Sequence, residues 1–481
     1  MHKDIVVVGA GISGIAAGYN LQKSCPDKSF VILEGRESLG GTWDLFKYPG
    51  VRSDSDMHTL GFRFKPWIHK KSIADGPSIL NYLNETVDEY SLREKIMFNQ
   101  KVVSSNWVSE KSMWELTIKS DGQEIHMTCN FLFLCGGYYS YDKPYMPEFP
   151  NQDTFQGRLI HPQFWDESLD YTDKKVIVIG SGATAVTLVP AIAKNASHVT
   201  MLQRSPSYVV SAPAEDSWSK MLNYILPTRL TYFLIRWKNI LRTSIGFYLS
   251  RKYPAKVKVR LTNLVREELG QDFDVDKHFM PKYNPWDQRM CLVPDGDLFM
   301  AIRDGKASVV TDMIDRFDEN GIHVQSGEFL DADIIVSATG IEINALNDID
   351  VTVDQIKVEP HKKFSYKGMM LSGVPNLAFT FGYVNSSWTL RADLTCEYVC
   401  RLLNQMDKEG VSACIPDEDV NAMGEDEYVD FSSGYVQRAL DKMPKQGQQS
   451  PWRNYQNYSK DIFLVRLFSL KDSTLRFYNP K

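Results

Sequence analysis

The sequence predicts an α/β protein with two Rossmann-like dinucleotide-binding domains, because one pattern of strand, glycine loop and helix occurs twice. The first copy is DIVVVGAGISGIAAGYNL, beginning at Asp4, and the second is KKVIVIGSGATAVTLVPAIAKN, beginning at Lys174. In each copy a short apolar run ends in glycine and a helical pattern follows. No other internal repeat occurs, so the pair indicates two copies of one fold rather than a repeat array.

Length, charge and cysteine usage exclude several other classes of protein. The 481 residues suffice for two or three domains with separate cores. A formal net charge of −6 gives no reason to expect nucleic acid. The seven cysteines are scattered without a CxxC pair, so we expect reduced thiols, no metal site and a cytoplasmic location. We expect no signal peptide, because a strand starts near Asp4, and no apolar run reaches membrane-spanning length.

The first glycine loop has the three glycines that a dinucleotide site needs. Gly9 permits the tight turn, Gly11 lets the backbone approach a pyrophosphate, and Gly14 allows the helix to pack closely on the strand. Phosphates would lie at the helix N-terminus, where free N–H groups favour anions. A second apolar run, FVILEG, ends in Glu34, which is expected to hold a ribose through its hydroxyls. This site suits a dinucleotide without an extra phosphate, such as FAD.

The second loop differs at the residue that follows its second strand. Gly180, Gly182 and Ala185 occupy the three loop positions, and the strand HVTMLQRSP ends in Arg204 and Ser205 instead of an acid. A carboxylate there would repel a 2′-phosphate, whereas arginine accepts one through paired charge-assisted hydrogen bonds. The second site therefore suits NADPH. The alternative is that Arg204 is a solvated surface residue.

Two dinucleotide sites in one chain indicate a hydride that passes from a nicotinamide to a flavin, which is chemistry that side chains alone do not provide. Alternation between residues 96 and 134 predicts a small antiparallel meander. We expect an FAD-binding domain formed by residues 1–145 and 336–481, the latter including the C-terminal tail. We expect an NADP-binding domain at 146–335, with a helical insertion at about 212–285.

Two longer motifs resemble the paired signatures of flavin-dependent Baeyer–Villiger monooxygenases. GGTWDLFKYPGVRSD, residues 40–54, matches that family's two glycines, tryptophan, aromatic-Pro-Gly and closing aspartate. FQGRLIHPQFWD, residues 155–166, matches FxGxxxHxxxW followed by Pro or Asp. The related flavin-containing monooxygenases lack the tryptophan, so Trp165 favours the ketone-oxidising group. The stretches YNPWDQRMCLVPDGDLF and GYVNSSWTLRADL look most like the subgroup that includes the ethionamide-activating monooxygenase.

The resemblance implies roles for residues in both motifs. Arg289, in WDQRM, would stabilise the negative charge of a peroxy adduct, and Asp54 would orient it. The alternative is that these two residues form a structural ion pair between domains. The first motif would add three residues to the FAD site, namely Gly41, Thr42 and Trp43.

The second motif would be a connector that moves as NADP changes between its two tasks. Its signature residues are Phe155, Gly157, His161, Trp165 and Asp166. We expect His161 to act through conformation and hydrogen bonding rather than as a general base. The alternative is that His161 and Trp165 only pack between the domains.

The reaction that the resemblance implies uses NADPH and dioxygen to insert oxygen next to a ketone carbonyl through a C4a-peroxyflavin. Esters or lactones would result, and sulfides would be oxidised as a side activity. The alternatives are a flavin-containing N- or S-hydroxylating monooxygenase and a non-catalytic flavoprotein redox sensor. A disulfide reductase of related fold needs a redox cysteine pair soon after the first glycine loop. This class is excluded, because no cysteine occurs between Trp43 and Cys129.

The stretch from Ser217 to Arg266 has no acidic residue and contains eleven Lys or Arg among aliphatic and aromatic residues. One interpretation is an amphipathic element at a membrane surface. The interpretation we prefer is a helical insertion that shapes a substrate entrance and faces an acidic cofactor. Peripheral membrane contact stays an open alternative.

Overall fold

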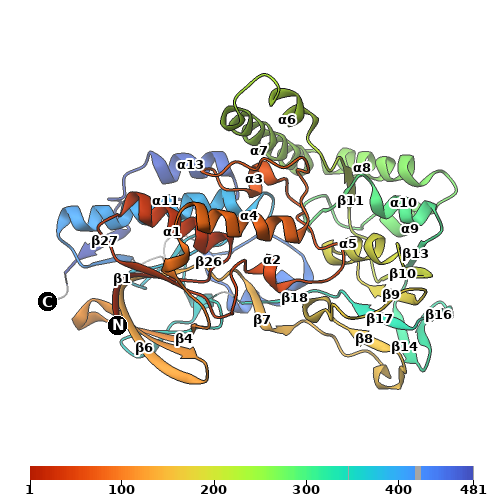
Figure 1. The fold of residues 1–481 in the computed structure, drawn as a ribbon, viewed down its shortest axis with the longest axis horizontal. Coiled ribbons are helices and arrows are strands. Elements are labelled where there is room, and N and C mark those ends of the chain that lie inside the picture. Colours follow the sequence, from red (N-terminus) through yellow and green to blue (C-terminus); the bar gives the residue numbers. More distant parts are fainter. Residues whose placement is uncertain (345, 418–423, 480–481) are drawn as a thin grey trace.

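The computed structural model describes residues 1–344, 346–417 and 424–479. Two large sheets lie toward opposite ends of the long axis of the molecule (Figure 1). The nine-stranded sheet takes its strands from residues 2–134 and 350–379, and the five-stranded sheet takes its strands from residues 158–337. The chain thus builds most of the first sheet, then the second, and then returns to the first.

The nine-stranded sheet combines a parallel centre with an antiparallel extension. In spatial order its strands are β20 (Ile356–Lys357), β19 (Asp350–Val353), β4 (Lys101–Val108), β5 (Met113–Ser120), β6 (Gln123–Leu134), β1 (His2–Val8), β2 (Phe30–Leu33) and β3 (Ile96–Met97), with β23 (Leu377–Phe379) paired to β6. β1 pairs in parallel with β2 and β6. β4, β5 and β6 form the predicted antiparallel meander, in which Trp107 lies opposite Trp114. The meander prediction is confirmed.

Helices and irregular segments cover both faces of this sheet. The helices of this half are α1 (Ile12–Ser24), α2 (Thr42–Leu45), α3 (Met57–Leu60), α4 (Gly76–Glu89), α11 (Trp388–Glu409), α12 (Gly434–Gln437) and α13 (Tyr458–Arg466). α1 and α11 pack together in one core cluster, and the meander encloses a second cluster around Trp107 and Trp114. Cover on both faces explains why the short runs of β1 and β2 are apolar without alternation.

The five-stranded sheet is wholly parallel. Its order is β13 (Ala307–Thr311), β10 (His198–Gln203), β9 (Lys175–Ile179), β17 (Ile334–Ser337) and β8 (Arg158–Ile160). The helices α5 (Ala183–Ile192) and α10 (Asp297–Arg303) pack against each other beside it. β17 pairs with β8 and β9, so this sheet runs two residues past the boundary expected after residue 335.

Smaller sheets complete the two halves. They are β14 (Ile314–Asp318) with β15 (Gly321–Val324) and β16 (Phe329–Asp331), β11 (Val209–Ala212) with β12 (Cys291–Pro294), β7 (Tyr139–Pro144) with β18 (Ile341–Ile343), β21 (Ser365–Tyr366) with β22 (Met370–Leu371), β24 (Ala413–Pro416) with β27 (Leu475–Tyr478), and β25 (Asp426–Glu427) with β26 (Lys445–Gln446). β7 and β18 bring together the two crossings of the chain between the large sheets.

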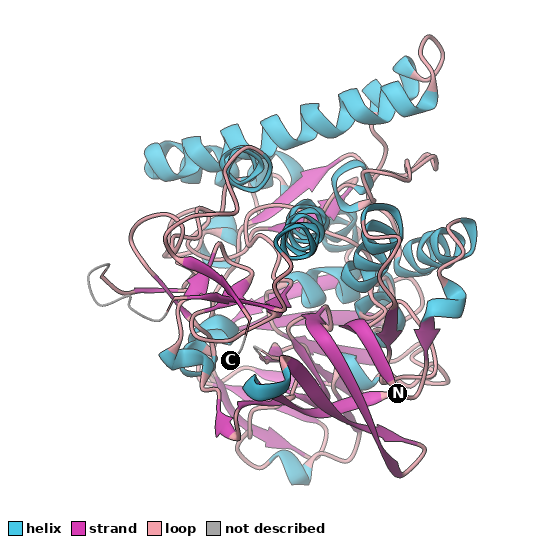
Figure 2. Cartoon of the chain, turned by 90° about the vertical axis from the view of Figure 1, so that its left-hand side faces the viewer, coloured by secondary structure: helices cyan, strands magenta, loops and turns pink. Residues whose placement is uncertain are grey.

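A group of helices lies between β11 and β12, which pair with each other and so hold its two ends together. The helices are α6 (Ser217–Leu222), α7 (Thr228–Lys252), α8 (Pro254–Leu269) and α9 (Val275–Phe279). α7 is the long helix at the top of Figure 1 and along the upper edge of Figure 2. It packs on α3 of the other half, where Arg236 donates hydrogen bonds to the carbonyls of His58 and Gly61 and pairs with Asp393.

No helix among the described residues is long and apolar enough to cross a membrane. Likewise, the described part of the chain contains no cluster of three or more His, Cys, Asp or Glu arranged to hold a metal ion.

Candidate functional site

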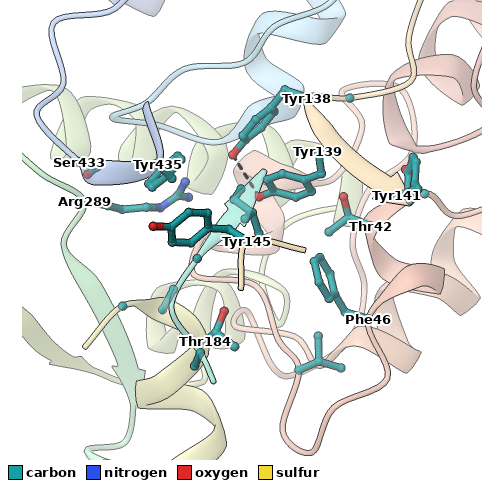
Figure 3. Close-up of a pocket in the computed structure, with 18 of the residues that line it drawn as sticks. Thr42, Phe46, Tyr138, Tyr139, Tyr141, Tyr145, Thr184, Arg289, Ser433 and Tyr435 are labelled. Carbon is teal, nitrogen blue, oxygen red and sulfur yellow. Dashed lines mark hydrogen bonds between the residues drawn. The ribbon is translucent and has the colours of Figure 1, made fainter. Parts of the chain in front are cut away.

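A cavity of about 980 Å³ lies where the two glycine loops face each other. Residues from both large sheets line it, together with the segment around residues 40–55 and the segment around Ser433 to Arg438 (Figure 3). The predicted site residues in its wall are Gly9, Gly11, Glu34, Gly41, Thr42, Trp43, Asp54, Gly180, Gly182, Arg204, Ser205 and Arg289. The fold therefore gathers most of the predicted site around one space.

The first loop is shaped by its own backbone. Gly9 has φ +99°, and a Cβ there would lie 2.7 Å from the Cα of Gly136. A Cβ on Gly14 would lie 1.8 Å from the carbonyl oxygen of Gly9, so Gly14 serves helix packing outside the cavity wall. Gly11 is the N-cap of α1 and provides no side-chain cap, which leaves backbone N–H groups at this end free of an internal partner.

Glu34 ties this loop to the end of β2. Its two carboxylate oxygens accept hydrogen bonds from the backbone N–H groups of Ala10 (2.7 Å) and Arg36 (3.0 Å). Burial raises the pKa of Glu34, and the two backbone hydrogen bonds oppose that rise. A carboxylate oxygen has further lone pairs, so Glu34 can accept ribose hydroxyls at the cavity wall.

The second glycine loop has the geometry of the first, except that its middle glycine has more open space around it. Gly180 has φ +141°, and a Cβ there would lie 2.4 Å from the carbonyl oxygen of Ala338. Gly182 is the N-cap of α5 without a side-chain cap, and a Cβ there would meet no atom within 4 Å. Ala185, on the buried side of α5, is fully buried in the core and does not line the cavity. Two helix N-termini without side-chain caps thus open into the same cavity.

Arg204 and Ser205 lie at the end of the strand that follows the second loop. Arg204 is exposed at the cavity and forms no hydrogen bond or salt bridge with any residue that the structure describes. The side chain therefore keeps all its N–H donors for a ligand. This geometry is compatible with a phosphate-binding role, although solvent also reaches the guanidinium.

Segment 40–54 crosses from the first loop toward the second half. Gly41 has φ +57° and its Cα lies against Gly11, so the segment closes over the first loop. Thr42 and Trp43 begin the short helix α2 and line the cavity.

Arg289 and Asp54 meet in the cavity wall although 235 residues separate them in sequence. The Nε and Nη2 groups of Arg289 donate to the two carboxylate oxygens of Asp54 at 2.8 and 3.0 Å. This bidentate pair fixes the plane of the guanidinium. The Asp54 carboxylate raises the pKa of Arg289 well above its ordinary value, so the cation is permanent. The Arg289 side chain remains 34% accessible.

Tyrosines surround this arginine, and the sequence motifs did not indicate them. The hydroxyls of Tyr138 and Tyr139 are 3.0 Å apart, and Tyr435 lies beside Arg289 (Figure 3). Burial raises the pKa of Tyr139 to about 12, and it also raises the pKa values of Tyr138 and Tyr435, so all three stay protonated at neutral pH. Arg438 stacks on the ring of Tyr145 at 3.4 Å.

The connector residues lie beside the cavity rather than in its wall. A Cβ on Gly157 would lie 2.3 Å from the carbonyl oxygen of Asp333, and Phe155 packs on Phe317 in a separate core cluster. Trp165 packs at the edge of the core of the second half. Asp166 is exposed and accepts hydrogen bonds from Ser168. The glycine of this motif therefore satisfies a close backbone contact.

His161 uses both ring nitrogens within the fold. Nδ1 accepts a hydrogen bond from the backbone N–H of Gln163 (3.1 Å), which requires the proton on Nε2, and Nε2 donates to the carbonyl of Gly340 (3.2 Å). Burial lowers the pKa of His161. A neutral imidazole with both nitrogens occupied is poorly suited to act as a general base. It instead ties the connector to a residue of the cavity wall.

The fold and this cavity define an α/β protein with two dinucleotide-type domains around one shared site. The chain belongs to the flavin-binding monooxygenase-like family, whose profile matches residues 73–390, and an NAD(P)-binding Rossmann-like profile matches residues 7–70. The predicted membership of the flavin monooxygenases is confirmed.

Curated relatives match the chain over nearly its whole length. It is 51% identical to the FAD-containing monooxygenase EthA of Mycobacterium tuberculosis (strain ATCC 25618 / H37Rv), over 99% of this chain and 98% of the relative. It is 48% identical to the probable FAD-binding monooxygenase AlmA of Acinetobacter baylyi, over 99% and 96%.

Solved structures share its fold at low sequence identity. Oxidized steroid monooxygenase bound to NADP matches with a TM-score of 0.80 and 21% identity over 100% of both chains. The open crystal structure of cyclohexanone monooxygenase matches with a TM-score of 0.77 and 20% identity over 99% of this chain and 100% of that one. The predicted α/β fold with Rossmann-like domains is confirmed.

Proposed function

We propose that this chain is an FAD-containing Baeyer–Villiger monooxygenase, which uses NADPH and dioxygen to insert oxygen next to a ketone carbonyl. The observation that carries the proposal is the bidentate Arg289–Asp54 pair in the wall of a cavity shared by both glycine loops. The names of its relatives as FAD-containing monooxygenases, and of a structural relative as bound to NADP, support the choice of cofactors.

The first loop fits the FAD pyrophosphate. The α1 N-terminus lacks a side-chain cap, and Gly11 leaves its backbone accessible from the cavity, so N–H groups and the helix dipole can bind phosphate oxygens. Glu34 would hold the adenosine ribose. The next segment would cover the bound FAD through Gly41, Thr42 and Trp43.

The second loop fits NADPH for the same reason and for one more. Gly182 leaves open space where any larger residue would place a Cβ, directly at the α5 N-terminus. Arg204 and Ser205 would bind the 2′-phosphate, because a guanidinium and a hydroxyl are both donors there.

These fits assign one dinucleotide to each domain. Residues 1–145 and 336–481 would form the FAD-binding domain and residues 146–335 the NADP-binding domain, with β17 carrying the second domain to residue 337. Helices α6–α9 would be the insertion. The connector 155–166 would couple the domains through the hydrogen bond from His161 to Gly340.

FAD, when bound, supplies the oxygen-activating chemistry, and NADPH supplies the hydride. The chain's own contribution is electrostatic. Arg289 has five N–H donors, of which two are held by Asp54, so others can stabilise an oxygen that gains negative charge beside a substrate carbonyl. Asp54 holds the guanidinium in place before reaction, and the neutral tyrosine hydroxyls can donate to the same oxygen.

The test compares two steps in Arg289→Ala. Hydride transfer does not require stabilisation of an oxygen anion, so anaerobic bleaching of the flavin by NADPH should persist. Ester formation from a ketone panel should fall by about 10²–10³, as for other lost preorganised donors. Asp54→Ala should act in the same direction but less severely. The double variant should lose less than the sum, because the two residues act as a unit.

Asp297→Asn is the matched control. Asp297 forms a second interdomain ion pair, with Arg52; Asp297 itself lies outside the cavity wall, whereas Arg52 is part of that wall. If Arg289 and Asp54 were only a structural pair, Asp297→Asn would lower ester yield similarly. A near-normal ester yield from Arg289→Ala would contradict the proposal. Oxidation of sulfides or amines by that variant would support an N- or S-hydroxylating monooxygenase.

A further inference from the structure

The helices α6, α7 and α8 expose an unusual number of large apolar side chains. Of the twenty-six exposed large apolar residues in the described chain, fourteen fall between residues 217 and 266, which is about a tenth of its length. We refer to them as the α6–α8 surface: Trp218, Met221, Tyr224, Ile225, Leu230, Phe233, Leu234, Leu241, Ile245, Tyr248, Leu249, Tyr253, Val259 and Leu264. Monomeric proteins seldom leave such a concentration exposed without a partner.

The long helix α7 shows that this exposure is one continuous face. Its inward side, including Tyr232, Arg236 and Asn239, is buried on the other half of the molecule. Residues spaced by three or four positions, from Leu230 to Tyr248, follow the opposite side. At 1.5 Å per residue, the 25 residues of α7 extend this outward face over roughly 37 Å. Helix α7 itself lies at the outer edge of the molecule in both views (Figures 1 and 2).

Its charge is of one sign. Seven cations of these helices form no salt bridge with any described residue, namely Lys220, Arg229, Arg242, Lys252, Lys256, Lys258 and Arg260. Residues 217–266 contain no acid, although the whole chain carries a net charge of −6. Two of the acids that flank this stretch in sequence are already paired, Asp216 with Lys238 and Glu268 with Arg303. The basic character is therefore local to this surface.

We propose that the α6–α8 surface docks on an anionic lipid bilayer, with α7 lying in the plane of the interface. Apolar side chains would enter the boundary between headgroups and acyl chains, and the cations would bind lipid phosphates. Trp218, Tyr224 and Tyr248 have the amphipathic rings that favour this boundary. A symmetric dimer through the same surface would place like charges against each other, since such a contact pairs a patch with itself.

The experiment is flotation of the full-length flavoprotein with vesicles. Phosphatidylcholine vesicles containing an equal share of phosphatidylglycerol should carry the protein, and pure phosphatidylcholine vesicles should carry much less. The apolar variant is Phe233→Ser, Leu241→Ser and Ile245→Ser combined, and the charge variant is Arg229→Glu, Arg242→Glu and Lys256→Glu combined. Each should reduce the bound fraction by at least about tenfold.

The control variant combines Ile68→Ser and Ile356→Ser, which replace apolar residues that are 71% and 75% exposed outside this surface. It should float like the parent, and circular dichroism melts should be alike for all forms. Absence of flotation by the parent protein overturns the proposal, as does equal binding to both vesicle types with no effect of the charge variant. Sedimentation velocity that shows a dimer broken by the apolar variant would assign the surface to self-association and overturn it as well.

Discussion

Among single residues, the glycines of the two loops differ in whether the packing of the backbone requires them. Gly14 and Gly180 are required by the fold, because a methyl group at either would overlap a backbone carbonyl oxygen. Gly182 has open space around it, and Gly11 has only an ordinary contact at 3.5 Å. These two positions therefore report on ligand binding without disturbing the fold.

Gly182→Ala should leave the melting temperature and FAD content unchanged while raising the KM for NADPH. The added methyl group meets no protein atom within 4 Å but occupies the space in front of the α5 N-terminus. The comparison is Gly14→Ala, in which the Cβ would lie 1.8 Å from the Gly9 carbonyl oxygen and folded protein should be lost. An unchanged KM in Gly182→Ala would remove the second loop from the NADPH site.

Arg204→Ala should weaken the use of NADPH and leave that of NADH nearly unaltered. Loss of a charge-assisted contact to the 2′-phosphate costs about 1.5–3 kcal/mol, or about ten- to a hundredfold in kcat/KM. Arg204 has no partner among the described residues, so its removal should not change stability. Steady-state kinetics with both coenzymes provide the measurement, and equal losses for the two would contradict the assignment.

At the level of secondary structure, α7 and the connector (residues 155–166) both join the two halves of the molecule, but through different kinds of interaction. α7 uses a buried charge, since Arg236 donates to the carbonyls of His58 and Gly61 and pairs with Asp393. The connector uses neutral hydrogen bonds through His161. Removal of one partner from a buried ion pair lowers the stability of the protein strongly. A neutral histidine can instead gain a proton when the pH falls, so its hydrogen bonds depend on pH.

Arg236→Ala should lower the free energy of unfolding by about 3–5 kcal/mol, because it leaves the buried Asp393 carboxylate without its cation. Lys238→Ala on the same helix removes a partly exposed pair with Asp216 and should cost at most about 1 kcal/mol. Chemical denaturation of both variants measures the difference. Similar small effects would show that α7 is not held by the Arg236 site.

His161→Ala should slow turnover and increase the release of hydrogen peroxide without loss of FAD, because the connector loses its tie to Gly340 at the cavity wall. The assay compares NADPH consumed, product formed and peroxide released. Unchanged coupling with only a lower melting temperature would assign His161 to packing.

The same residue predicts a pH effect on stability. Burial lowers the pKa of His161 below its ordinary value of about 6.5, so the unfolded chain binds this proton before the folded chain does. Stability should therefore fall as pH drops below about 6.5 toward the folded pKa. The fall should be smaller in His161→Gln, whereas replacement of the exposed His126 should leave it unchanged.

For the molecule as a whole, the cavity is the space that the two sheets share, so a ligand there should stabilise the entire chain. FAD at about 100 times its Kd should add about 2.7 kcal/mol to the free energy of unfolding. The deflavinated protein should melt at a lower temperature, followed by circular dichroism, and FAD should restore it. Riboflavin, which lacks the pyrophosphate, should not. Identical melting of both forms would contradict the proposed FAD site.

The local features of this protein could be derived from the sequence alone. Both loops, the strands before them, the helices after them and the meander of β4 to β6 follow from periodicity and glycine placement, because these signals act between near neighbours. Arg289 and Asp54 were singled out by motifs, but only the fold brings them into contact across a sequence separation of 235 positions.

Other parts of the site had no local signal. Tyr138 and Tyr139 are adjacent in sequence but far from Tyr435, and the three line one cavity with Arg289 because the returning chain closes it. The same reason applies to α7, whose apolar residues occur on both faces. Composition could not distinguish a buried insertion from a surface-seeking helix, because the choice depends on which face meets the other half and which stays uncovered.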